Sequence, residues 1–228
     1  MSTSTRRKTS AIERVTRDPV SRRKFFLLTG GTGSAAAFLA ACGGDDSSST
    51  STAAGTSSTA MSDDSGASSQ FGEGDLGIVN YALTLEYLET AFYNDVAKSG
   101  LFKGDDLALI KAIAKTEQQH VDALTATAKQ LGGPVAPEPK AEFPLKDAKS
   151  VLELAATVEN LGAAAYLGQA AAIENPDILA AALSIHSVEG RHAAVLNTLT
   201  GEPPTPDGAF AQGADMQTVL EAVQPFLV

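Results

Sequence analysis

The sequence contains no tryptophan and only one cysteine, and each scarcity excludes a class of protein. A single cysteine cannot form an intramolecular disulfide, and it cannot build a metal site of several thiolates. Aromatic residues make up 6% of the 228 residues, too few for an aromatic-rich binding face. Glycine and proline rarely interrupt the C-terminal two thirds, where alanine and leucine are frequent, and this favours helices over a β-sandwich or barrel.

Positive charge is scarce outside the N-terminal segment. Residues 1–41 hold 8 of the 17 basic and 2 of the 27 acidic residues, which leaves 9 basic and 25 acidic residues in residues 42–228. Nucleic acids and anionic lipid surfaces are bound through basic patches. The composition therefore predicts that the acidic part of the chain does not bind nucleic acid.

Residues 1–41 predict an export signal rather than a folded domain. Polar and basic residues lead up to Arg22 and Arg23, and 17 mostly apolar or small residues follow from Phe25 to Ala41. That stretch is shorter than the roughly 20 residues of a membrane-spanning helix. The order of a basic, an apolar and a small-residue region is that of a secretory signal, and the paired arginines resemble a twin-arginine signal.

Cys42 stands where this signal would end. The sequence Leu-Ala-Ala-Cys-Gly around it resembles a bacterial lipobox, in which the cysteine is acylated and becomes the new N-terminus. The alternative is an ordinary small residue beside a cleavage site, but the one cysteine of the chain falls where lipidation needs it. We therefore expect an exported protein, lipid-anchored to the outer face of a bacterial membrane in the cell envelope, with that membrane as a partner.

Residues 42–74 contain almost no apolar side chains to bury, so they cannot offset the entropy of becoming ordered. We expect them to form a flexible tether with a typical reach of about 30 Å. A folded domain is expected over residues 75–201, followed by a C-terminal tail, residues 202–228, with a short helix.

Apolar residues recur at helical spacing from Asp75 onward. The expected helices run from about Asp75 to Lys98, from Asp105 or Asp106 to Gly132, from between Asp147 and Ser150 to just before Asn175, and from Pro176 to Gly201, with a short fifth over about Asp215 to Gln224. Short turns within the first and the second pair predict two antiparallel hairpins. The proline-containing linker between them, about 15 residues, can extend to about 50 Å, longer than a 26-residue helix at about 39 Å. The sequence thus predicts an all-α four-helix bundle with one long crossover.

Two Glu-x-x-His patterns carry the candidate chemistry, Glu117 with His120 and Glu189 with His192. Residues three apart share a helix face, so each pair can direct a carboxylate and an imidazole at one point. Two of the three histidines of the chain follow a glutamate in this way, and a doubled pattern is much more specific than a single match.

The other two long helices each contain a glutamate seven residues before a tyrosine, Glu86 with Tyr93 and Glu159 with Tyr166. The hairpins therefore look like copies of one unit, and a pseudo-two-fold axis would bring four glutamates and two histidines together. Four buried carboxylates need compensation. Lysine and arginine are missing at matching positions, whereas two divalent cations would cancel the charge. Mixed carboxylate and imidazole ligands suit Fe or Mn, with Zn also open.

This pattern resembles the ferritin-like di-iron and di-manganese carboxylate proteins, such as bacterioferritin and manganese catalase, over roughly residues 75–200. The resemblance implies a ferritin-like four-helix bundle. It also implies a ligand set in which Glu86 and Glu159 are single-helix ligands, Glu117 and Glu189 bridge, and His120 and His192 each cap one metal.

The resemblance further implies redox chemistry with dioxygen or peroxide, such as Fe(II) oxidation or peroxide removal, with small oxygen species or metal ions as substrate. A lipid tether argues against a closed cage that stores iron. The sequence does not decide whether the chain forms a homo-oligomer. The alternatives are a non-enzymatic metal-binding or stress- or desiccation-associated scaffold protein of the envelope, and a bundle that has lost its metal.

Other residues near the pattern leave alternatives open. Tyr93 and Tyr166 either line the site in a catalytic role or are buried with hydrogen-bonded hydroxyls. Glu89 lies one turn after Glu86 and could substitute as a ligand, but it is expected to be solvated, because its counterpart in the repeat is Gly162. His186, one turn before Glu189, is expected to be a hydrogen-bonded core histidine, with a supporting role at the site as the alternative.

Overall fold

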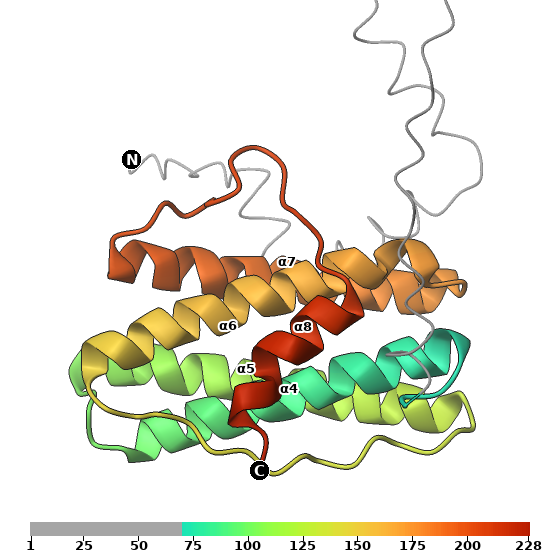
Figure 1. Cartoon of the computed structure of the whole chain (residues 1–228), viewed down its shortest axis with the longest axis horizontal. Coiled ribbons are helices and arrows are strands. Elements are labelled where there is room, and N and C mark those ends of the chain that lie inside the picture. Colours follow the sequence, from blue (N-terminus) through green and yellow to red (C-terminus); the bar gives the residue numbers. More distant parts are fainter. Residues whose placement is uncertain (1–69) are drawn as a thin grey trace, which may run out of the picture. The chain divides into compact units, whose positions relative to one another are not determined.

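Helices make up most of the part of the chain that the computed structural model describes, residues 70–228 (Figure 1). Four long helices are α4 (Gly74–Lys98), α5 (Gly104–Gln130), α6 (Ala148–Gln169) and α7 (Pro176–Thr200), and short ones are η2 (Ala170–Ala172), α8 (Met216–Val223) and η3 (Gln224–Phe226). β-Pairing within residues 70–228 is limited to an isolated bridge between Ala141 and Leu227. The predicted all-α fold is confirmed. The predicted export signal, Cys42 and nearly all of the predicted tether lie outside the described residues.

The ends of the helices follow from local chemistry. Asp147 accepts a hydrogen bond from the Ser150 backbone N–H, which starts α6 with a capping box. At the start of α7 the Asn175 side chain accepts a hydrogen bond from the Asp177 backbone N–H, and Pro176 occupies the first turn. Gly201 ends α7 with φ of 86°, a left-handed conformation that glycine adopts without steric strain.

α4 packs along α5, and α6 packs along α7, as two antiparallel hairpins (Figure 1). The crossover between them, residues 131–147, runs the length of the bundle. Asn80 of α4 holds its first part, because its side chain donates to the Pro134 carbonyl at 3.0 Å and accepts from the Ala136 N–H at 2.9 Å. The connection is therefore anchored to the first hairpin.

The C-terminal segment completes the core of the bundle. Met216, Val219 and Val223 of α8 are buried in a cluster with residues of α4 and α6. The chain approaches α6 so closely that a Cβ at Gly168 would collide with the Ala214 carbonyl. α8 thus adds a fifth, short helix across α4 and α6 (Figure 1).

Two large apolar clusters occupy opposite ends of the four-helix bundle. One includes Phe92, Ile113 and Leu196, and the other includes Leu83 and Leu124. The polar residues of the repeat meet between these clusters, in the middle of the bundle. Among the described helices, none combines the length and apolar character that crossing a membrane requires.

Candidate metal centre

All six residues of the predicted ligand set meet halfway along the bundle. α4 supplies Glu86, α5 supplies Glu117 and His120, α6 supplies Glu159, and α7 supplies Glu189 and His192. The four glutamates are 0% exposed and His120 is 7% exposed. Since each residue lies near the middle of a long helix, backbone hydrogen bonds on both sides fix its position.

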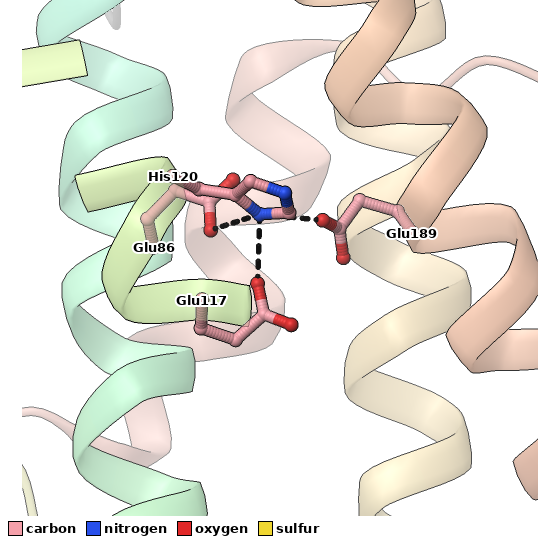
Figure 2. A group of neighbouring side chains, drawn as sticks. All are labelled: Glu86, Glu117, His120 and Glu189. Carbon is pink, nitrogen blue, oxygen red and sulfur yellow. Dashed lines mark hydrogen bonds and ion pairs between the residues drawn. The ribbon is translucent and has the colours of Figure 1, made fainter. Parts of the chain in front are cut away.

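His120 faces three carboxylates from three helices (Figure 2). Its Nδ1 atom lies 3.2 Å from Glu86 Oε2, 2.9 Å from Glu117 Oε2 and 3.0 Å from Glu189 Oε1. Glu189 reaches across from the second hairpin, so the group joins the two halves of the bundle.

His192 faces the corresponding group on the other side of the pseudo-two-fold axis. Its Nδ1 atom lies 2.9 Å from Glu117 Oε1, 3.2 Å from Glu159 Oε2 and 3.9 Å from Glu189 Oε2. Glu117 and Glu189 therefore each direct one oxygen toward each imidazole. Glu159 takes part in this group alone, as Glu86 does in the first.

The donor set fits a cation better than it fits hydrogen bonding within the protein. An imidazole Nδ1 carries at most one hydrogen, yet three carboxylate oxygens lie within 3.2 Å of this atom in His120. Four buried carboxylate oxygens, Glu117 Oε1, Glu159 Oε1 and both oxygens of Glu189, have no hydrogen-bond partner among the described residues. Ligand atoms about 2.1 Å from a divalent cation and at right angles are about 3.0 Å apart, close to the 2.9–3.2 Å between His120 Nδ1 and its three carboxylate oxygens. The six residues thus form two overlapping groups that could hold metal ions.

Comparison with known proteins agrees with this geometry. A family model described as a ferritin-like domain matches residues 74–202. The chain belongs to this ferritin-like family. A similar solved structure is the crystal structure of a conserved hypothetical protein, rv2844, from Mycobacterium tuberculosis, with a TM-score of 0.50 and 22% identity. The match covers 60% of this chain and 93% of that chain, and it supports the fold alone. No curated protein matches the chain by sequence.

Burial dominates the protonation of the glutamates in this ferritin-like centre. Burial, assisted by the charges of neighbouring carboxylates, raises the pKa of Glu86 to about 8 and that of Glu189 to about 8. Burial also raises the pKa of Glu159. For Glu117 burial acts in the same direction, but hydrogen bonds with both histidines outweigh it and lower the pKa to about 2.

The histidines hold protons strongly because carboxylates surround them. Burial works against the charged imidazolium, but hydrogen bonds with Glu117 and other carboxylates raise the pKa of His120 to about 12 and that of His192 to about 10. Among residues 70–228, the buried carboxylates form ion pairs with these two histidines and with no lysine or arginine. A metal ion must displace the Nδ1 protons to bind there, so metal binding and proton release are coupled.

Each tyrosine of the repeat is buried against a glutamate of the other hairpin. The Tyr166 hydroxyl donates to Glu86 Oε1 at 2.5 Å. Burial, followed by the charge of Glu159, raises the pKa of Tyr93 well above its ordinary value. Tyr93 and Tyr166 therefore both line the ferritin-like centre. Tyr166 also has a hydrogen-bonded hydroxyl, which was the alternative expectation for these two residues.

The expectation that Glu89 is solvated is wrong. Glu89 is 4% exposed, and a Cβ at Gly162 would lie 2.7 Å from its Oε1 atom. The missing side chain of Gly162 thus makes room for this carboxyl group. Burial, then the charge of Glu189, raises the pKa of Glu89 well above its ordinary value. Glu89 breaks the symmetry of the repeat but belongs to neither group of closely spaced ligand atoms.

His186 is hydrogen-bonded, as expected, but half-buried rather than enclosed in the core. Its Nδ1 atom donates to the Ala163 carbonyl at 3.0 Å. It lines a cavity of about 280 Å³ under the loop around Asp207, on the outer side of α6 and α7. The structure therefore places His186 outside the group of metal-facing residues.

Proposed function

We propose that the ferritin-like domain holds two Fe or Mn ions and uses them for redox chemistry with dioxygen or peroxide. The observation that carries this proposal is the sharing of Glu117 and Glu189, each of which directs oxygens at both histidines. Glu86 and His120 would complete one metal position, and Glu159 and His192 the other. Four carboxylates balance two divalent cations, and this ligand mixture suits iron or manganese.

The protein would prepare this centre in several ways. Two divalent Fe or Mn ions held there would supply the electrons for reducing dioxygen or peroxide and would themselves be oxidised. Tyr166 holds Glu86 Oε1 with its hydroxyl and leaves Oε2 directed at the centre. Tyr93 stands beside Glu159 in the equivalent place, so the two tyrosines are the candidate residues for positioning these carboxylates at the centre. The apolar clusters above and below exclude bulk water and large substrates.

The location of this chemistry is a further part of the proposal. Arg22 and Arg23 would direct export, and acylated Cys42 would anchor the domain outside a bacterial membrane. The order of basic, apolar and lipobox-like segments supports this. Cell fractionation tests it: the wild type should enter the membrane fraction. Cys42→Ser should be released from it, and Arg22→Lys/Arg23→Lys should stay in the cytoplasm.

A second candidate is a metal-binding scaffold without turnover, favoured by the complete burial of the four glutamates. Stopped-flow absorbance distinguishes the redox function from the scaffold function. The full chain carrying Cys42→Ser is loaded with Fe(II) under nitrogen and mixed with dioxygen or peroxide. An oxygen- or peroxide-dependent spectrum that is lost in Glu117→Ala/Glu189→Ala supports the redox function. A spectrum of the bound metal that neither oxidant changes supports the scaffold function.

A further inference from the structure

A small cavity lies in the apolar cluster at the end of the bundle where α4 begins. Its volume is about 30 Å³, and all four long helices line it. The lining includes Ile78, Ala82 and Leu85 of α4, Leu124 of α5, and Ala165 and Tyr166 of α6. It lies on one side of the metal-facing residues, not among them.

The size and lining of the cavity restrict what it can hold. One water needs about 10–15 Å³ and two to four polar partners. The cavity of about 30 Å³ has the room, but its surface is almost entirely apolar. The Thr127 hydroxyl, a polar group of the lining, already donates to the Ala123 carbonyl. Apolar cavities of this kind stay dry and take up apolar ligands. Organic substrates are too large for this cavity, since their pockets are about 300–1,000 Å³. The ligand class that fits both the size and the lining is a small apolar gas.

The cavity connects the surface with one side of the centre. The exposed or half-exposed residues of the lining are Ile78, Thr127, Ala181 and Ala182, so the cavity reaches the surface where α4, α5 and α7 border it. At the inner end, the Tyr166 side chain lines the cavity while its hydroxyl donates to Glu86 Oε1 at 2.5 Å. One side chain therefore separates the cavity from a metal-facing carboxylate.

We propose that this cavity binds dioxygen. A diatomic apolar molecule fits the volume and the lining, and it would be held against Tyr166 on the Glu86 side of the centre. Hydrogen peroxide would be poorly bound, because its hydroxyl groups would lose water without gaining partners. The inference rests on the proposed function, since a reaction with dioxygen is what such a site would serve.

The binding itself can be tested without metal. Methyl NMR spectra of the metal-free full chain carrying Cys42→Ser are recorded under dioxygen and under nitrogen. Paramagnetic dioxygen should broaden the methyl signals of Val79 and Leu124, which are buried and line the cavity, more than those of the equally buried Ile110 and Val151 in the opposite cluster. Equal broadening in the two clusters would overturn the proposal.

Variants then test the site. Ala182→Leu fills the opening and should abolish the preferential broadening, with Ala82→Val as a second variant that fills the inner part. Ala180→Leu, exposed on the same helix and outside the lining, is the matched control and should preserve the broadening. Preferential broadening that persists in both cavity-filling variants would overturn the assignment.

Kinetics link the cavity to the centre. If Ala182→Leu keeps dioxygen out of the cavity, the burial of its two atoms, each about the size of a methylene group, is lost. Oxidation of the Fe(II)-loaded protein by dioxygen should then slow about tenfold. Oxidation by peroxide should be unchanged, which also shows that Ala182→Leu is folded and loaded. Unaltered oxidation by dioxygen would overturn the role of the cavity. A wild type that reacts with neither oxidant would instead contradict the proposed function, and the NMR result would still decide whether the cavity binds gas.

Discussion

Replacement of Glu189 by glutamine should change how the stability of the metal-free domain depends on pH. Burial raises the pKa of Glu189 to about 8 in the folded state from an ordinary value of 4.5. Below pH 4.5 the carboxyl is protonated in both states, and as the pH rises toward 8 only the unfolded state releases the proton. The stability contribution of this group is therefore fully present below pH 4.5 and is lost as the pH rises through 8.

The size of the effect follows from the same shift. Between pH 5 and pH 8 the linkage amounts to a loss on the order of 3 kcal/mol of unfolding free energy from Glu189 alone. Glutamine resembles the protonated carboxyl and cannot ionise. Between pH 5 and pH 8 the unfolding free energy of Glu189→Gln should therefore fall by about 3 kcal/mol less than that of the wild type. Glu86, whose pKa is also raised to about 8, mainly by burial and in part by the charge of Glu189, contributes in both proteins, so the difference between the proteins reports Glu189 together with its effect on Glu86.

Urea denaturation followed by circular dichroism at pH 5 and pH 8 measures this difference. Glu153→Gln is the matched control, because Glu153 is exposed and pairs only with Lys149 in the described part of the chain. Equal pH dependence in the wild type and Glu189→Gln would refute the reasoning. Added Mn(II) at about 100 times its dissociation constant should stabilise the wild type by about 2.7 kcal/mol, and Glu189→Gln much less.

Three further substitutions test separate parts of the account. Tyr166→Phe should destabilise the domain by about 1–3 kcal/mol in thermal denaturation, because a buried carboxylate oxygen loses its donor; an unchanged melting temperature would contradict this. Gly162→Ala should be less stable than Gly190→Ala by about 1–2 kcal/mol, since only the first meets the buried Glu89 carboxyl, and equal stability would place Glu89 elsewhere. Asn80→Ala should speed proteolysis of the crossover, as it removes its side-chain hydrogen bonds, and an unchanged cleavage rate would show that they are dispensable.

The helices were predictable because their signals are local. The residues that cap α6 and α7, Asp147 and Asn175, are readable from a few neighbouring positions. The meeting of the six metal-facing residues was predictable for a different reason: the internal repeat relates the two hairpins, so a pattern within one hairpin also indicates its partner.

Features that depend on two elements far apart in the sequence were not predictable in this way. Glu89 and Gly162 lie on α4 and α6, and the repeat compared them as counterparts when they are in fact packed together. The sequence indicated a short helix over about Asp215 to Gln224, but not that its Met216, Val219 and Val223 pack on α4 and α6. The cavity beside Tyr166 depends on side chains of four helices, and no sequence pattern specifies a space.

The most direct test of the central claim is the metal content of the full chain carrying Cys42→Ser, purified without added metal and measured by mass spectrometry. The account predicts about two Fe or Mn ions per chain, and their loss in Glu117→Ala/Glu189→Ala, which removes the two shared carboxylates. A folded helical wild type without metal, or a double variant that keeps the same metal content, would contradict it.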